Sequence, residues 1–333
     1  MQNRLIDPST GKVRFGGRVN PRTGEPLIGT GWVADPPDRR DFGIEDALRG
    51  KSAATGRRQE KLELLSKALK KINWSNDTKK DAALKKSCSL RADFSPIESQ
   101  GEIGSCTAHA AVGLVEYFQR RAFGRHIDGA RLFVYKATRQ VGGFEGDSGA
   151  YLRTAMAALA LFGVPPEKHW PYTDDPVEFD RDPPPFVYSL AANYQSTIYF
   201  CYDPFGSETD SAKLVTRLKQ GIARKIPAMF GFYGFDSFGY SENAGEIPFP
   251  GNEETAQWGH AVVLCGYDDS KKIRNTLTGD TTTGAFEIRN SWGPEWGDGG
   301  YGWIPYKYVE EGLAHDFWSI LDMEWIDTNR FGV

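Results

Sequence analysis

The hydrophobic pattern of this chain changes once, near Pro227, from helical spacing to short strand-like runs. Before that point, apolar residues recur at intervals of three and four after Ser105, after Gly149 and over residues 211–224, which predicts helices. Beyond it, apolar and aromatic residues gather in short runs separated by Gly, Asp and Pro, which predicts strands. A helical half followed by a sheet half indicates an α+β fold, and the junction between the halves is a natural ligand site.

Composition and charge exclude several classes of function. The 333 residues are 40% hydrophobic, and the formal charge of −4 is spread over the chain without the basic stripe that binding to nucleic acid requires. Apolar runs fall short of the roughly 18 residues needed to span a bilayer, and the N-terminus lacks the apolar segment of a secretory signal. We therefore expect a soluble protein with no nucleic-acid or membrane partner, either cytoplasmic or exported without a recognisable signal.

The four cysteines are too far apart for a CxxC metal site or a dense disulfide framework. Motifs of P-loop, HExxH and GxSxG enzymes are also missing, so we expect neither a metal nor a cofactor. Cys265 lies in an apolar run and is expected in the core, whereas Cys88 and Cys201 are expected to be reduced, with pairing between them as the alternative.

Cys106 lies where a glycine-rich turn meets the start of a predicted helix. The positive end of a helix favours thiolate over thiol, which makes Cys106 a candidate nucleophile. Among five histidines, His260 is the best placed base because it opens the apolar strand 261–264, and the amide of Asn290 could orient its ring. Taken singly, a strand histidine and a turn asparagine also have purely structural explanations.

These residues belong to motifs that resemble, in order, those of papain-like cysteine peptidases. His260 follows Cys106 by 154 residues (260 − 106), against roughly 130 in that family, and the polar tract 275–284 is predicted to be a hairpin extension. The resemblance covers about residues 89–322. It rests on Ser99-Gln100-Gly101, Gly104-Ser105-Cys106, Gly259-His260-Ala261-Val262 and the run Asn290-Ser291-Trp292-Gly293-Pro294-Glu295-Trp296-Gly297-Asp298-Gly299-Gly300-Tyr301-Gly302.

The resemblance implies a helical lobe, an antiparallel, barrel-like β-rich lobe, and an active site in the cleft between them. It implies that Cys106 is the thiolate nucleophile, that His260 donates the proton to the leaving amine and that Asn290 orients His260. Gln100 would stabilise the oxyanion together with the backbone N–H of Cys106. Trp292 would shield the hydrogen bond between His260 and Asn290 from water.

The resemblance also suggests where substrate binds. Residues 146–150, which include Ser148 and Gly149, align with the wall that pairs with an extended substrate, and Gly149 permits close approach of a backbone. Residues 313–318 resemble the lining of the pocket for the second side chain before the cut bond. Asp316 there would favour basic side chains, with a structural salt bridge as the alternative.

Two departures from the family pattern stand out. Ile103 replaces the usual cysteine three residues before the nucleophile, and the cysteine that normally pairs with it is replaced near Asp147. The typical disulfide is therefore missing, and a reducing compartment is expected. Thr107 replaces the aromatic residue that normally follows the nucleophile, which makes the match closer to bacterial members of the family.

We divide the chain into an N-terminal extension (1–88), a peptidase domain (89–326) and a tail (327–333). The extension contains a predicted amphipathic helix near 57–72 and has the length of a pro-segment. Residues 31–42 resemble a lead-in of bacterial relatives. We expect part of 1–50 to pack near Cys106 as an intramolecular inhibitor, as in a zymogen, the alternative being a structural arm on the back of the domain.

The expected activity is that of an endopeptidase that cleaves peptides or proteins through a thioester. A peptide ligase or acyl transferase on the same site is the first alternative, because an amine would then replace water. A catalytically silent peptide-binding module is the second.

Overall fold

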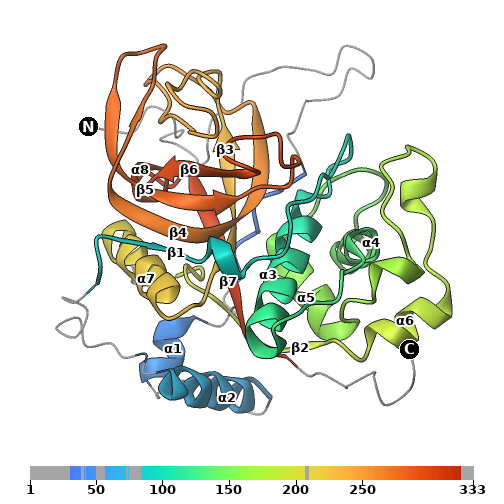
Figure 1. Cartoon of the computed structure of the whole chain (residues 1–333). Helices are drawn as coiled ribbons and strands as arrows, with labels where there is room; N and C mark the ends of the chain where they lie inside the picture. The colour runs from blue at the N-terminus through green and yellow to red at the C-terminus, as the bar shows by residue number, and fades with distance from the viewer. Residues whose placement is uncertain are drawn as a thin grey trace.

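The computed structural model of the chain describes residues 31–38, 41, 43–49, 57–72, 74, 84–206 and 210–323, so the tail 327–333 lies outside the described residues. A helical lobe and a sheet lobe lie side by side (Figure 1). Within the described ranges, none of the helices combines the length and apolarity needed to cross a membrane. The helical lobe comprises α3 (Cys106–Phe123), α4 (Arg131–Gly142), α5 (Leu152–Leu161) and α6 (Pro185–Ala191), with short 3-10 turns at Arg91–Asp93, Glu167–His169 and Glu178–Asp180.

The sheet lobe is antiparallel and confirms the predicted α+β fold. Its strands lie in the order β2-β7-β3-β4-β5-β6, and β1 pairs with β4. The strands are β1 (Ser87–Ser89), β2 (Ser196–Cys201), β3 (Ala228–Gly234), β4 (Trp258–Arg274), β5 (Thr281–Arg289), β6 (Tyr301–Pro305) and β7 (Ala314–Met323), with α7 (Ser211–Ala223) and α8 (Tyr306–Glu310) packed against them. The polar tract 275–284 lies at the end of the β4–β5 hairpin, as predicted: residues 275–280 form the turn, and Arg274 pairs with Thr281 where β5 begins.

Helix α3 is the central element, because it packs against α4 and α5 on one side and against β3, β4 and β7 on the other. Its side chains are buried on nearly every face, as expected for a helix between two layers. Gly113 permits the close approach to the sheet lobe, since a Cβ there would lie 2.9 Å from Nη1 of Arg289 in β5. The helix ends at Gly124, whose left-handed backbone caps it.

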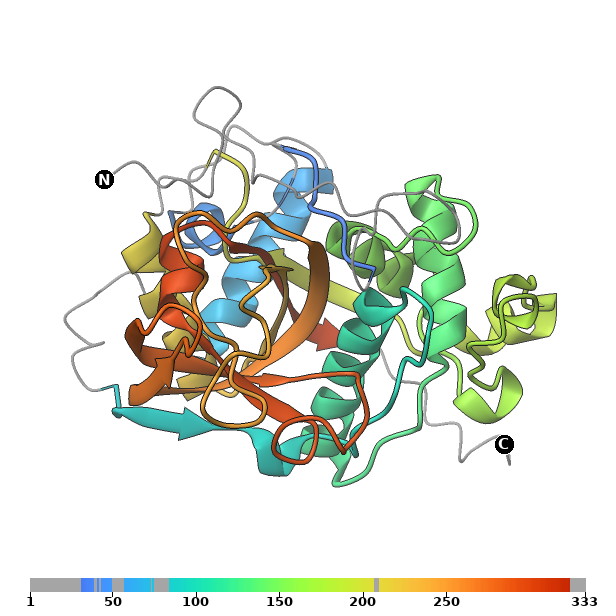
Figure 2. The ribbon, with the colours of Figure 1, turned by 90° about the horizontal axis from the view of Figure 1, so that it is seen from above.

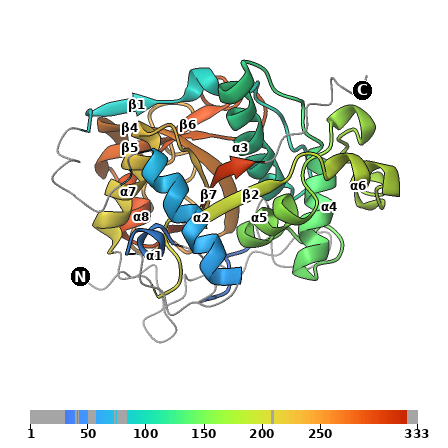
Figure 3. The ribbon, with the colours of Figure 1, turned by 90° about the horizontal axis from the view of Figure 1, so that it is seen from below.

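Part of the N-terminal extension shares the core of the main fold. Helix α2 (Arg57–Lys71) lies across β2 and β7 (Figure 3) and buries Leu62, Leu65 and Leu69, which form the predicted apolar stripe. Helix α1 (Ile44–Arg49) packs against α2. The division at residues 88 and 89 remains a prediction, but removing everything before Ser89 would expose this apolar face.

All four cysteines are free in the structure, so Cys88 and Cys201 are not paired. Cys265 is fully buried, as expected of a core residue. These thiols require no oxidising environment to hold the fold together.

Leu69→Ala should lower the free energy of unfolding by about 2–5 kcal/mol, because it removes a fully buried side chain between α2 and the sheet. Leu64→Ala is the matched control on the same helix, where the side chain is 48% exposed, and should change it by no more than about 0.5 kcal/mol. Urea unfolding followed by circular dichroism measures both. Equal effects would show that α2 is not part of the cooperative core.

Candidate active site

Cys106 is the first residue of α3 and lies where that helix meets the sheet lobe. Its side chain is fully buried, and Sγ accepts a hydrogen bond of 3.4 Å from the backbone N–H of Ala261 in β4. The thiol is therefore held between the helix N-terminus and the strand that carries His260.

His260 and Asn290 meet through their side chains, as the sequence predicts. Nε2 of His260 lies 2.7 Å from Oδ1 of Asn290, and the same oxygen accepts the backbone N–H of Ser291 at 2.8 Å. Because an amide oxygen only accepts, Nε2 must carry the proton, and Nδ1 of the neutral ring is then the acceptor. Nδ1 is buried and has no hydrogen-bond partner within the described part of the chain, so it is available to take a proton.

Trp292 lies flat against the imidazole of His260. The ring centroids are 4.4 Å apart and the planes are 23° from parallel, while Trp258, Trp296 and Phe238 contact the indole edge-on. This aromatic cover is consistent with the role expected of Trp292, which is to keep water from the hydrogen bond between His260 and Asn290.

Gln100 is buried beside the start of α3. Its Oε1 accepts the hydroxyl of Ser291 at 2.7 Å, and its Nε2 donates to the carbonyl of Ile103 at 2.9 Å. The amide is thus oriented by groups on both sides of the junction. Its N–H group lies near the helix N-terminus, where an oxyanion formed by attack of Cys106 would need donors.

Sequence reasoning did not assign a role to Asp147, which fixes the turn before Cys106. Its Oδ1 accepts the backbone N–H of Gly104 at 2.8 Å and the hydroxyl of Tyr135 at 2.6 Å. The same hydroxyl accepts the backbone N–H of Gly149 at 3.1 Å. The sequence offered one signal for this role, because the family resemblance implies that the usual disulfide partner is replaced near Asp147.

Gly149 and Ser148 lie at the edge expected to pair with substrate. Gly149 has a left-handed backbone with φ of +71°, and a Cβ there would lie 2.3 Å from the carbonyl oxygen of Gly31. Ser148 donates its hydroxyl to the carbonyl of Gly149 at 3.1 Å. This edge is therefore occupied by the N-terminal segment.

Residues 31–38, which we call the arm, run across this junction (Figure 2). Trp32 forms a parallel bridge with Ala150, in which the N–H of Val33 donates to Ala150 O at 3.1 Å and the N–H of Ala150 donates to Gly31 O at 2.8 Å. Gly31 also touches Gly104, two residues before Cys106. Part of the extension thus packs near Cys106, while residues 1–30 lie outside the described residues.

Carboxylates hold the arm in place. Oδ2 of Asp316 accepts the indole N–H of Trp32 at 3.2 Å and the backbone N–H of Asp35 at 2.8 Å. The side chain of Asp35 accepts the indole N–H of Trp318 at 3.0 Å and the backbone N–H of Arg153 at 3.1 Å. Asp316, expected to contact substrate, therefore contacts the arm here, and sequence reasoning missed the roles of Trp32, Asp35 and Arg153.

Burial keeps the candidate nucleophile and base neutral. Desolvation raises the pKa of the Cys106 thiol to about 12 and lowers the pKa of the His260 imidazole to about 3, and the hydrogen bonds from Ala261 and Asn290 only partly oppose it. At pH 7 the pair is therefore thiol and imidazole.

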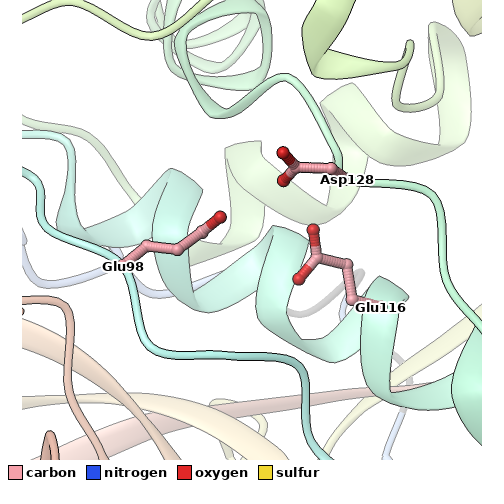
Figure 4. Close-up of side chains that lie close together, drawn as sticks. All are labelled: Glu98, Glu116 and Asp128. Carbon is pink, nitrogen blue, oxygen red and sulfur yellow. The ribbon is translucent and has the colours of Figure 1, made fainter. Parts of the chain in front are cut away.

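A second cluster of titratable groups lies outside this site, where Glu98, Glu116 and Asp128 converge (Figure 4). The guanidinium of Arg131 pairs with Glu98 and lies 3.6 Å from Asp128. Glu116 accepts the backbone N–H of Gly129 at 2.9 Å, and burial raises its pKa to about 7. Carboxylates at this spacing are also suited to a cation, but Arg131 already supplies the positive charge, so we assign the cluster a structural role.

Comparisons with known proteins agree on one family. The family described as "Papain family cysteine protease" matches residues 84–318. A peptidase C1-like protein of Acanthamoeba polyphaga mimivirus is 33% identical over 74% of this chain and 76% of its own length. Chicken cathepsin K is 26% identical over 62% of this chain and 54% of its own. The crystal structure of xylellain, a cysteine protease from Xylella fastidiosa, superposes with a TM-score of 0.64 at 30% identity, covering 89% of this chain and 96% of that one.

Cys106 should remain a thiol from pH 6 to pH 9 in the full chain, because burial raises its pKa to about 12. The difference in far-ultraviolet thiolate absorbance between the unaltered chain and Cys106→Ala measures the thiolate at this position. Cys88→Ala is the control that removes a half-buried thiol. Thiolate absorbance from Cys106 that is already present at pH 7 would contradict the raised pKa.

Proposed function

Because the chain belongs to the papain family of cysteine proteases, we propose that it is an endopeptidase that uses Cys106, His260 and Asn290. The observation that carries this proposal is the arrangement at β4. There, the N–H of Ala261 donates to Sγ of Cys106, and the preceding residue, His260, is oriented by Asn290 at 2.7 Å. The strand thus brings an oriented imidazole to the thiol at the positive end of α3.

Acylation begins when the arm leaves and Cys106 transfers its proton to Nδ1 of His260. The thiolate attacks the peptide carbonyl carbon, and the negative charge that forms on its oxygen is stabilised by the backbone N–H of Cys106 and the side-chain amide of Gln100. The tetrahedral intermediate then expels the amine. Imidazolium at His260 gives that amine its proton, which leaves a thioester on Cys106.

Deacylation repeats these roles with water. His260 takes a proton from water as the oxygen attacks the thioester carbonyl, and the sulfur leaves as thiolate. Asn290 holds the ring through Nε2 in both halves of the reaction, so Nδ1 is the only nitrogen that exchanges protons. The products are a carboxylic acid, an amine and the regenerated enzyme.

The arm acts as an intramolecular inhibitor in this proposal. Three features support it: the arm pairs with Ala150, it contacts Gly104 and Gly149, and Cys106 and His260 are fully buried beneath the covered junction. Forming the ion pair is unfavourable in this arrangement because both charges would be desolvated. Release of the arm and ionisation of the pair are therefore linked.

Cys106→Ala should abolish hydrolysis of an unstructured protein substrate and also prevent labelling by a peptidyl epoxide that alkylates thiols. Cys88→Ala, the matched control, should retain both. Cleavage is followed by the release of new amino termini, and the label is located by mass spectrometry. Full activity of Cys106→Ala would exclude the proposed nucleophile.

Trp32→Ala should increase the rate of epoxide labelling roughly tenfold or more. The substitution removes the most deeply buried side chain of the arm, so a larger fraction of molecules should have the arm released and Cys106 accessible. Pro37→Ala lies in the same segment, where the side chain is exposed, and should have little effect. Thermal unfolding of both variants checks that the fold persists. If Trp32→Ala folds but reacts no faster than the unaltered chain, the arm does not inhibit.

A further inference from the structure

Trp32 is the most deeply buried side chain of the arm. Trp32 is 2% exposed, whereas the residues that follow it are half-buried or exposed up to Pro37. The indole enters a pocket, called here the Trp32 pocket, formed by Gly231, Gly259, Tyr233, His315 and Asp316. The pocket lies beside His260, because Gly259 directly precedes that residue in β4. A pocket that buries one large ring there is suited to select a substrate side chain.

Two glycines form the floor of the Trp32 pocket. A Cβ at Gly231 in β3 would lie 1.9 Å from Cε2 of Trp32, and a Cβ at Gly259 in β4 would lie 2.8 Å from Cε3. Neither glycine has a positive φ, so the backbone does not require glycine at either position. Glycine inside a strand weakens it and often marks the close approach of a ligand. Space for a flat ring is the physical reason for glycine here.

The walls and the far end of the pocket complement an indole. The ring centroids of Tyr233 and His315 lie 5.0 and 4.9 Å from that of Trp32, at tilted and edge-on angles. Oδ2 of Asp316 accepts the indole N–H at 3.2 Å. The pocket therefore offers aromatic contacts to the ring and one acceptor at the position of its only donor.

The acceptor is held in an unusual backbone conformation. Asp316 has φ of +61°, which is uncommon for a residue other than glycine. Its backbone N–H and that of Phe317 both donate to the carboxylate of Asp203, at 2.9 and 2.8 Å. Such a conformation persists only where its surroundings maintain it, and here it directs a carboxylate into the pocket.

The family resemblance assigns residues 313–318 to the pocket for the second side chain before the cut bond, and we propose that in this chain the Trp32 pocket selects tryptophan at that position. Gly231 and Gly259 admit the indole, Asp316 accepts its N–H, and Trp32 of the arm imitates the substrate side chain. This proposal rests on the proposed peptidase activity. A basic side chain would reach Asp316 but would leave the space above the two glycines unfilled, and an empty space of this kind is unfavourable.

Cleavage by Trp32→Ala in the full chain tests the preference, since this variant vacates the pocket. The substrates are fluorogenic peptides that differ only at the second position before the cut bond, which is Trp, Phe, Leu or Arg. We expect kcat/KM for the Trp peptide to exceed each of the others by roughly tenfold or more, because a site built around a hydrogen bond discriminates against side chains that lack it. An equal or higher value for Leu or Arg would overturn the proposal.

Further substitutions in the Trp32→Ala chain distinguish the contribution of the glycine floor from that of the Asp316 acceptor. Gly231→Ala should lower the ratio of Trp to Leu cleavage at least tenfold. Asp316→Gly suits the left-handed backbone and removes the acceptor, so the ratio of Trp to Phe should fall close to one. Asp316→Asn keeps an acceptor oxygen and should preserve most of that ratio. Unchanged ratios in both Gly231→Ala and Asp316→Gly would contradict the assigned roles.

A binding measurement distinguishes failure of this proposal from failure of the peptidase proposal. Calorimetry with the double variant Cys106→Ala, Trp32→Ala needs no turnover, and the Trp peptide should bind at least tenfold more tightly than the Phe or Arg peptide. Preferential binding without cleavage by Trp32→Ala would support the pocket and contradict the peptidase. Binding without preference would overturn the Trp32 pocket proposal whatever the activity.

Discussion

The meeting of α3 with β4 at Cys106 is the contact on which the rest of the structure depends. One hydrogen bond, from the backbone of Ala261 to the sulfur, joins the helical lobe to the sheet lobe at the point where the reaction is proposed to occur. Because both the thiol and the imidazole of His260 are fully buried there, their protonation states follow the solvent exposure of the junction. The contact between α3 and β4 thus determines both how the two lobes pack and how Cys106 and His260 are protonated.

A noncovalent clamp holds the turn before Cys106 where related enzymes are expected to have a disulfide. Asp147 accepts hydrogen bonds from Gly104 and Tyr135, and Tyr135 in turn holds Gly149. Hydrogen bonds to a carboxylate are strong and directional. This clamp does not depend on the redox state of the surroundings, in keeping with the free thiols of the chain.

Sequence reasoning predicted the elements that depend on local periodicity and ordered motifs. The spacing of Leu62, Leu65 and Leu69 predicted α2, and the change of pattern near Pro227 predicted the two lobes. The pairing of His260 with Asn290 followed from the motifs. The binding site of Trp32 could not be predicted, because it joins residues up to 284 positions apart and the reason for Gly231 is visible only when the indole is in place.

The arm remains attached to the body that it covers. Arg153 pairs with Asp41 at 2.6 Å just beyond the arm, and Ile44 in the next helix is part of the hydrophobic core. A ligand tethered this closely has an effective concentration in the millimolar range. If the arm inhibits as proposed, dilution of the protein cannot release it, and a substrate must compete with a constant local concentration of arm. The rate of cleavage would then depend on the local concentration of substrate segments near the site, and not on the concentration of the protein.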